Sequence, residues 1–282
     1  MVSQVLQFDV YGTLIDWDSG LYAALQPLLN RYLASASWSR EQALLTFDQL
    51  EVDMKACYPT MLHPDILSRV HEAMEEKIRA LSPLDTTLPP LTSDEERHAF
   101  GFCPKTFEVF PDTPDALQRL AQHFKLVVLS NIDNQCFAHT LARMSAPAEY
   151  PACVDTYTRP PGTVRWLPQN VPRSRSPFTF ILTAQDTGVY KPDLLGFRTM
   201  IARLSDVPEL APNAGKEGLF VVANDLRIDH VPAQELGIRS VWIDRRGIGE
   251  EAAIRWLGGK KWQRRFTTLG EMADAVERGE FP

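Results

Sequence analysis

Short, continuous runs of apolar residues recur along the chain. They are Val5–Val10, Leu126–Leu129, Phe178–Thr183, Leu219–Ala223 and Ser240–Ile243. Because these runs are continuous rather than alternating, they are typical of parallel strands buried on both faces. Helical patterns lie between them, for example over residues 112–123 and over 192–204, where Pro192 suits a helix start. This alternation predicts an α/β fold with a doubly wound, Rossmann-like parallel sheet.

The interval between the first two runs has a helical pattern throughout. Its amphipathic segments are LYAALQPLLNRYL, REQALLTFDQLEVDMKA, PDILSRVHEAMEEKIRAL and SDEERHAF. We therefore predict a helical cap domain over residues 17–103, inserted into a core domain made of residues 1–16 and 104–282. The cap is expected to cover the carboxyl edge of the sheet, where open α/β sheets bind ligands.

A proline-rich stretch separates the second and third runs. Seven of the 21 prolines fall between Pro147 and Pro177, and they exclude a central strand or an uninterrupted helix. We predict an insertion in the core domain over residues 148–178, forming a long loop with a hairpin around Thr156–Leu167. Long loops are often functional. The insertion could therefore be a lid over the site, or a loop at the surface or at a dimer contact.

Charge and cysteine content narrow the class of protein. The net charge is −7, whereas nucleic-acid-binding domains are usually basic, so no nucleic-acid partner is expected. The basic cluster Lys260, Lys261, Arg264 and Arg265 is interpreted as a solvated helix face. The four cysteines lack CxxC spacing, which favours a reduced, cytoplasmic protein over a disulfide or zinc framework. Neither a long apolar segment nor a signal-peptide pattern occurs, so no membrane partner is expected.

Polar side chains follow four of the runs, at the point where each predicted strand ends. They are Asp9 and Thr13 in FDVYGTL, Ser130 and Asn131 in LSN, Lys191 in YKPD, and Asn224, Asp225 and Asp229 in ANDLRID. Because the carboxyl ends of parallel strands share one edge of a sheet, these groups are expected to converge. Carboxylates, hydroxyls and an ammonium at one site are suited to covalent catalysis.

In this order, the four motifs resemble those of the haloacid dehalogenase (HAD) superfamily. The resemblance covers nearly the whole chain, including a helical cap after the first motif. Tyr11, the LSN triplet and the stretch LTAQDTGVYKPD are most similar to the type II 2-haloacid dehalogenase branch. The resemblance implies a hydrolase with a small-molecule substrate. It also implies that the chain can form a homodimer.

Chemistry and resemblance together suggest the catalytic roles. Asp9 is expected to be the nucleophile that forms a covalent intermediate, and Lys191 is expected to hold its charge and orientation. Ser130 and Thr13 are expected to bind substrate oxygens or the departing anion. Asp229 is a candidate to position Lys191 or to assist a water, although it could also simply begin the helix running to Leu236.

Further residues are candidates for contact with the substrate. They are Tyr11, Asn131, Asn224 and Trp17, of which Trp17 could instead only pack at the hinge between the domains. The neighbouring His230 is expected to pack locally rather than to act as a base. Asp225 could join Asp9 in a Mg²⁺ site, since this hard cation prefers oxygen ligands.

Tyr11 bears on the choice between carbon–halogen and phosphoryl chemistry. Phosphatases of the superfamily usually carry an aspartate at this position, which protonates the leaving alcohol. A tyrosine with a pKa of about 10 cannot easily shuttle that proton at neutral pH, and a halide leaving group needs none. The sequence therefore favours a 2-haloacid dehalogenase-like hydrolase that requires no cofactor.

Two departures from the family pattern keep alternatives open. Haloacid dehalogenases use an arginine from the early cap helices to hold the halide or the substrate carboxylate, and here Thr46 or Phe47 stands at that place. Motif four begins with Asn224 where phosphatases usually have aspartate, yet Mg²⁺ remains possible. A Mg²⁺-dependent phosphatase of small metabolites is the second hypothesis, and a catalytically weak binding protein is the third.

Overall fold

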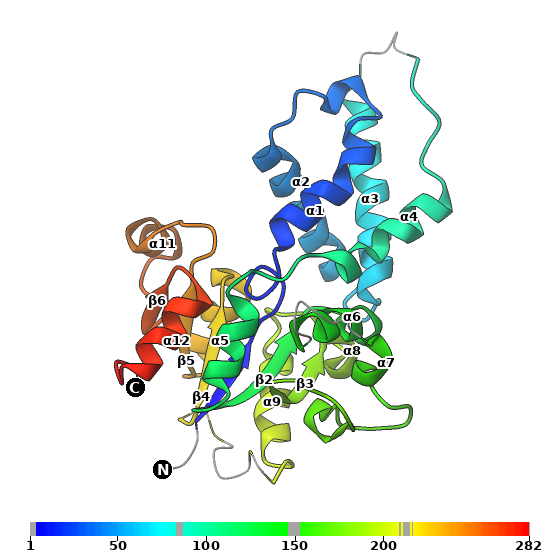
Figure 1. Cartoon of the computed structure of the whole chain (residues 1–282). Coiled ribbons are helices and arrows are strands. Elements are labelled where there is room, and N and C mark those ends of the chain that lie inside the picture. The colour runs from blue at the N-terminus through cyan, green and yellow to red at the C-terminus, as the bar shows by residue number, and fades with distance from the viewer. Residues whose placement is uncertain are drawn as a thin grey trace. The chain divides into compact units, whose positions relative to one another are not determined.

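The chain divides into two compact units (Figure 1). The computed structural model describes residues 4–82, 87–145, 153–208, 210, 215 and 217–281. The core unit consists of Met1–Asp16 and Val109–Pro282, and the helical unit consists of Trp17–Glu108. The helical unit ends at Glu108, whereas the sequence predicted its end at residue 103.

A six-stranded sheet forms the centre of the core unit. Its strands are β1 (Val5–Phe8), β2 (Lys125–Ser130), β3 (Phe178–Thr183), β4 (Leu219–Ala223), β5 (Arg239–Ile243) and β6 (Arg264–Phe266). They lie in the order β3-β2-β1-β4-β5-β6, and all neighbouring pairs are parallel. The predicted doubly wound parallel sheet is confirmed. The strands β2 and β3 are added on one side of β1, and β4, β5 and β6 on its other side. The order therefore reverses between β1 and β4, and ligands bind such sheets at this switch point, outside the carboxyl ends of the strands.

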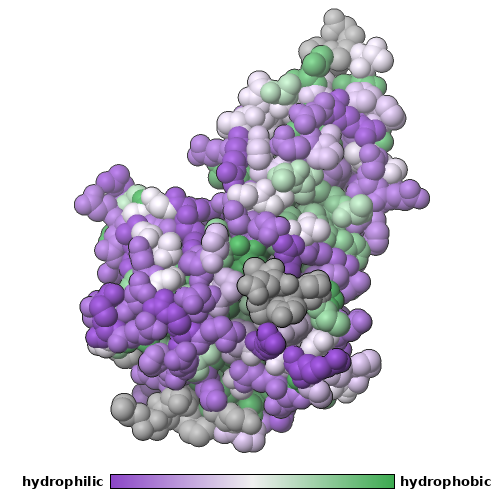
Figure 2. Space-filling model, in the orientation of Figure 1, coloured by the Kyte–Doolittle hydropathy of each residue, from purple (hydrophilic) through white to green (hydrophobic). Residues whose placement is uncertain are grey.

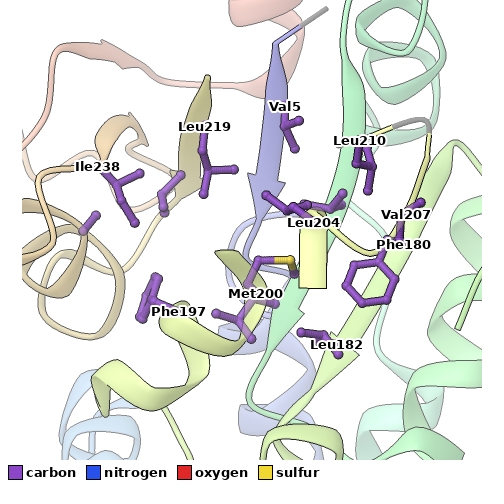
Figure 3. Close-up of a cluster of buried hydrophobic side chains, with 14 of the residues drawn as sticks. Val5, Phe180, Leu182, Phe197, Met200, Leu204, Val207, Leu210, Leu219 and Ile238 are labelled. Atoms are coloured by element: carbon purple, nitrogen blue, oxygen red, sulfur yellow. The ribbon is translucent and has the colours of Figure 1, made fainter. Parts of the chain in front are cut away.

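Helices flank the sheet and bury its apolar faces. Those of the core unit are α5 (Thr113–Leu120), α6 (Asn134–Ser145), α7 (Val154–Tyr157), α8 (Ala184–Thr187), α9 (Leu194–Leu204), α10 (Val231–Glu235), α11 (Glu250–Leu257) and α12 (Leu269–Glu277), with the 3₁₀ turn η3 (Pro168–Asn170) and the π-helical turn η5 (Leu226–His230). Phe197, Met200 and Leu204 of α9 pack in one buried cluster with strand residues such as Val5 and Leu219 (Figure 3). This packing holds the strands rigidly, so that the residues following them have defined positions.

The basic cluster near residue 260 does not form a helix face, so that prediction was wrong. Helix α11 ends at Leu257 and is followed by Gly258 in the left-handed region, with φ of +67°. Arg264 and Arg265 then lie in β6, which pairs with β5. The backbone of this segment satisfies its hydrogen bonds in the sheet, and Trp262 is buried against Trp242. These contacts with β5 replace the solvated helix that the charge pattern suggested.

The proline-rich insertion does not contain the predicted hairpin at 156–167. Residues 148–152 of the predicted insertion lie outside the described residues, and the remainder forms α7, loops and η3. Trp166 makes one antiparallel bridge to Ile181 in β3, an edge strand of the sheet. Its ring packs edge-on against Phe137 of α6. The prolines thus suit a chain that is held against the sheet edge by separate contacts.

The helical unit contains four helices and two 3₁₀ turns among its described residues. They are α1 (Trp17–Leu29), η1 (Leu33–Ser35), α2 (Arg40–Cys57), α3 (His63–Ala80), α4 (Asp94–Gly101) and η2 (Cys103–Thr106). Ser39 caps α2 and Ser93 caps α4, each with its hydroxyl accepting from a backbone N–H. Leu25, Phe47 and Met74 are fully buried inside this unit.

Hydrophilic side chains cover most of the molecular face shown in Figure 2. Isolated large apolar side chains are exposed in both units, including Leu33, Val164 and Trp256. Single exposed apolar residues are normal in folded proteins. Among the residues that the structure describes, no helix combines the length and apolar character needed to cross a bilayer.

Candidate active site

Lys191 lies between two buried carboxylates that follow strands β1 and β4. Its Nζ donates to Asp9 Oδ1 at 2.8 Å and to Asp229 Oδ1 at 2.7 Å. Lys191 and Asp9 are each 4% exposed, and Asp229 is fully buried. Burial alone would lower the pKa of Lys191, but the charges of Asp229 and Asp9 outweigh burial and raise it. The ammonium is therefore protonated at neutral pH and can stabilise both carboxylates.

The strand register determines where Asp9 emerges. Phe8 pairs with Val128 of β2 and with Val222 of β4, so Asp9 leaves the central strand beside the ends of its neighbours. The chain then turns sharply over residues 9–15, which we call the Asp9 turn. Gly12 in this turn has φ of +88°, a conformation that an L side chain rarely adopts. The glycine thus allows the chain to fold back directly after the carboxylate.

Thr13 holds the second oxygen of Asp9. Its Oγ1 donates to Asp9 Oδ2 at 2.7 Å and accepts from the backbone N–H of Asn224 at 2.9 Å. Thr13 is fully buried. Each Asp9 oxygen therefore accepts one hydrogen bond from a fixed donor, which orients the carboxylate and leaves further lone pairs available for reaction.

Asn131 fixes the backbone of Lys191. The N–H of Lys191 donates to Asn131 Oδ1 at 2.7 Å, and Asn131 Nδ2 donates to the Lys191 carbonyl oxygen at 3.0 Å. Both polar groups of the amide are thus engaged with the lysine backbone. This arrangement couples the end of β2 to the loop after β3, and it accounts for Asn131 without a contact to substrate.

Asp225, rather than Asp229, begins the helical segment after β4. Asp225 Oδ1 accepts from the backbone N–H groups of Arg227 and Ile228 at 2.8 and 3.0 Å. The segment starts with the π-helical turn η5 and continues as α10, and π-helical turns are frequent at functional sites. The alternative that Asp229 merely starts a helix is therefore wrong.

The carboxyl group of Asp229 is in an unusual environment. Burial raises its pKa and the charge of Lys191 opposes this, while the nearby charge of Asp9 adds to the increase, so the pKa is raised overall. The adjacent His230 packs locally, as expected: its Nδ1 lies 2.8 Å from Ser240 Oγ and its Nε2 lies 3.0 Å from the Ala223 carbonyl oxygen.

Two buried oxygens at the site have no hydrogen-bond partner within the described part of the chain. They are Ser130 Oγ and Asp229 Oδ2. Buried polar atoms are nearly always hydrogen-bonded in native proteins. Ser130 is the last residue of β2, and Asp9 directly follows the neighbouring strand β1. These two oxygens are therefore suited to bind a substrate or a reacting water.

The other three proposed substrate contacts are placed differently. The Tyr11 hydroxyl lies 2.7 Å from Thr140 Oγ1 of α6. Asn224 Oδ1 accepts from the backbone N–H of Arg245 at 3.2 Å, so this side chain helps to join two loops. Trp17 is buried in the helical unit, where its ring packs against Phe107 with 5.3 Å between centroids.

The donor set does not favour a metal centre. Asp225 was predicted to join Asp9 as a ligand, but the Asp225 carboxylate caps η5 and the ammonium of Lys191 lies against Asp9. No group of three or more His, Cys, Asp or Glu side chains suited to a metal ion occurs within residues 4–82, 87–145, 153–208, 210, 215 and 217–281. We therefore assign no step to a metal.

Arg245 and Thr140 belong to the surroundings of the site but are not among the residues proposed from sequence. Arg245 is the second residue after β5, so its position behind an apolar run was a usable signal. Thr140 lies within a helix, and no local pattern points to its contact with Tyr11. The contact of Thr140 is therefore identified only once the fold brings distant segments together.

No protein-family model matches the chain, and no curated protein sequence matches it. Solved structures do match. An L-2-haloacid dehalogenase superposes with a TM-score of 0.63 at 18% identity, over 97% of this chain and 99% of that one. The L-2-haloacid dehalogenase from Xanthobacter autotrophicus with chloropropionic acid covalently bound gives 0.61 at 14% identity, over 98% of both chains. The HAD-hydrolase YfnB from Bacillus subtilis, bound to magnesium, superposes with a TM-score of 0.61 at 14% identity, over 98% of this chain and 100% of that one.

These similarities extend over nearly the full length of each chain. The protein therefore has the fold of the haloacid dehalogenase superfamily. It superposes to a similar extent on L-2-haloacid dehalogenases and on the HAD-hydrolase YfnB. The resemblance inferred from the four motifs is thus confirmed for the fold.

Proposed function

We propose that this chain is a HAD-type hydrolase that uses Asp9 as a nucleophile and forms a covalent aspartyl intermediate. The observation that carries the proposal is the buried Asp9 carboxylate, held by Lys191 on one oxygen and by Thr13 on the other. Preorganised donors of this kind hold a nucleophile at the correct angle without a cost of reorganisation during the reaction.

The substrate class that we propose is a small 2-halo acid or a related carbon–halogen compound. One oxygen of Asp9 attacks the carbon that bears the halogen, a C–O bond forms, and the C–halogen bond breaks with both electrons leaving on the halide. Water then attacks the carbonyl carbon of the aspartyl ester, which releases the hydroxy acid and restores the carboxylate. Asp229, whose Oδ2 is buried without a partner among the described residues, is proposed to accept a proton from that water.

Two features favour halide over phosphate as the leaving group. Tyr11 stands where phosphatases usually carry a second aspartate, and its hydroxyl is within hydrogen-bond distance of Thr140. Oδ1 of Asp225 caps a helical turn by accepting from two backbone N–H groups, so it is not available as a metal ligand. The covalent adduct with chloropropionic acid in the Xanthobacter autotrophicus enzyme supports the same reaction on this fold.

Within the core unit, substrate recognition is proposed to rest on Ser130. The helical unit carries no arginine at the two positions expected for one, Thr46 and Phe47. Phe47 is fully buried in that unit, so one of the two positions expected to carry an arginine contributes packing. The nearby Arg40 donates to Ser19 Oγ at 3.0 Å. Without that arginine, the hydroxyl of Ser130 becomes the principal candidate among the core residues to bind an anionic group of the substrate.

Chloride release from 2-chloropropionate, measured with and without a chelator, tests the proposal. Wild type and Asp225→Asn should release chloride without added metal, because asparagine retains the helix cap, whereas Asp9→Asn should be inactive. Mass spectrometry of a rapidly quenched reaction should find an ester on the peptide that contains Asp9.

A parallel assay with p-nitrophenyl phosphate and Mg²⁺ examines the competing reaction. Phosphate release that requires Mg²⁺, Asp9 and Asp225 would instead establish a phosphatase. Turnover of neither substrate would leave a binding protein as the better account.

A further inference from the structure

We propose that Arg245 is a positioning residue that keeps Thr13, and through it the carboxylate of Asp9, in a reactive orientation. This inference deepens the proposed function and rests on it. Arg245 does not belong to any of the four motifs, and it follows β5 at the edge of the sheet where the site residues gather.

The guanidinium of Arg245 contacts the Asp9 turn directly. Its Nε donates to the backbone oxygen of Thr13 at 3.0 Å. The side chain of Arg245 is only 7% exposed, so this hydrogen bond is shielded from water. Holding the carbonyl of Thr13 restricts the rotation of the residue whose Oγ1 donates to Asp9 at 2.7 Å.

The other end of the guanidinium is anchored away from the reacting groups. Nη1 donates to Asp112 Oδ1 at 2.8 Å, and Asp112 Oδ2 accepts from the backbone N–H of Leu269 at the start of α12. The guanidinium carbon lies 4.2 Å from the centre of the Phe110 ring. These contacts fix the orientation of Arg245 independently of any bound substrate.

A second connection reaches the same hydroxyl through Asn224. The backbone N–H of Arg245 donates to Asn224 Oδ1 at 3.2 Å, and the backbone N–H of Asn224 donates to Thr13 Oγ1 at 2.9 Å. Arg245 therefore acts on Thr13 from two sides, through the Thr13 carbonyl and through the donor that faces its hydroxyl.

The arrangement requires the shape of arginine as well as its charge. Nε and Nη1 point to different acceptors, the Thr13 carbonyl and the Asp112 carboxylate. A lysine has a single nitrogen at the end of a flexible chain, so it can keep the ion pair with Asp112 but cannot reproduce both contacts. Arg245→Lys thus separates the contact with the Asp9 turn from the structural ion pair.

Arg265 provides a matched control. It pairs with the buried Asp244, donating from Nε and Nη2 to Oδ2 at 3.0 and 2.7 Å, whereas the Asp112 partner of Arg245 is partly exposed. Its guanidinium carbon lies 5.4 Å from the centre of the Trp242 ring. The two arginines therefore resemble each other in pairing and stacking, but the hydrogen bonds of the Arg265 side chain go to Asp244 rather than to the Asp9 turn.

The experiment compares Arg245→Lys and Arg265→Lys with wild type in the full-length chain. Urea unfolding, hydrogen exchange of the backbone amides of residues 9–15, and steady-state kinetics are measured on each. The substrate is the one that wild type turns over in an Asp9-dependent manner. For Arg245→Lys we expect a cooperative unfolding transition with a lower midpoint, because a shielded hydrogen bond is lost. We also expect exchange faster by about tenfold and kcat lower by about tenfold at constant KM, because misorientation affects the reacting groups.

Arg265→Lys should match wild type in kcat and in exchange of the Asp9 turn. Wild-type kcat in Arg245→Lys, or an equal loss in both variants, would overturn the proposal. If wild type turns over neither 2-chloropropionate nor p-nitrophenyl phosphate, the proposed function fails separately. The exchange measurement then still decides the inference, since unchanged exchange in Arg245→Lys overturns it and selectively faster exchange supports it.

Discussion

Replacing Lys191 with methionine should leave two carboxylates facing each other in a buried site. Nζ of Lys191 lies 2.8 Å from Asp9 Oδ1 and 2.7 Å from Asp229 Oδ1, and its side chain is 2% exposed. Methionine retains most of the side-chain volume, so the change removes a charge with little loss of packing. The expected effect is therefore mainly electrostatic.

The distances allow the size of the effect to be bounded. At an effective dielectric constant of about 20, each ion pair corresponds to about 6 kcal/mol of Coulomb attraction. Part of this offsets the cost of removing all three groups from water, and removing one partner of a buried pair typically costs about 3–5 kcal/mol. We expect Lys191→Met to lower the free energy of unfolding by that amount near neutral pH.

The pH dependence has a definite sign. The pKa of Lys191 is raised in the folded protein, so its contribution is fully present below the unfolded lysine pKa of about 10.4 and is lost only as the pH rises through the higher folded value. In Lys191→Met, the folded state takes up a proton on a carboxylate more readily than the unfolded state. The difference in unfolding free energy between wild type and Lys191→Met should therefore shrink as the pH falls.

Urea unfolding followed by circular dichroism measures these differences. The double variant Lys191→Met/Asp229→Asn should recover much of the lost stability, because it removes the unpaired buried charge. Lys125→Met, at the partly exposed start of β2, is the control and should stay within about 0.5 kcal/mol of wild type. A Lys191→Met protein as stable as wild type near neutral pH would refute the reasoning.

Three further changes test the packing and the buried polar groups. Gln7→Met should raise the unfolding free energy by about 1–2 kcal/mol, because both amide atoms of Gln7 are buried and lack a partner among the described residues; no gain in urea unfolding would contradict this. Gly20→Ala should cost about 1–3 kcal/mol, measured by thermal unfolding, because the new Cβ would lie 2.4 Å from Cγ of Phe107. Burial lowers the pKa of His230 from 6.5 to about 4. The neutral, buried His230 therefore stabilises the folded state above the unfolded pKa. This stabilisation, roughly 3 kcal/mol, is lost as the pH falls through the folded pKa. His230→Asn should therefore weaken the loss of stability on acidification, measured by urea unfolding as the pH is lowered.

Most of the sheet could be predicted because buried parallel strands are recognisable by their apolar composition alone. Strands such as Phe178–Thr183 and Leu219–Ala223 are buried at every position. Strand β6 was missed because it spans only Arg264–Phe266 and carries two arginines. Its strand state depends on pairing with β5, which is a long-range contact that no local pattern encodes.

The candidate site was predictable to the extent that it follows from strand ends. The proximity of Asp9, Thr13, Lys191 and Asp229 is a consequence of parallel strands that deliver their following residues to one edge. The role of Asn131 was not predictable, because its side-chain amide is hydrogen-bonded to the backbone of Lys191, 60 positions away. Side chains that bind backbone groups leave no signature in residue type, so their partners become visible only in the folded chain.

The two edge strands of the sheet, β3 and β6, are protected in different ways from pairing with other chains. This protection affects how the protein can associate with itself. Trp166 of the proline-rich insertion accepts a hydrogen bond from Ile181 in β3, while β6 is short and presents arginines. Unpaired edge strands are templates for pairing with other chains, and prolines, charges and coverage by a loop are the usual safeguards. A homodimer of this chain would therefore use helices and loops for its contact rather than a continuous intermolecular sheet. Shortening the insertion would expose the backbone of β3, so its first consequence would be aggregation of the folded protein.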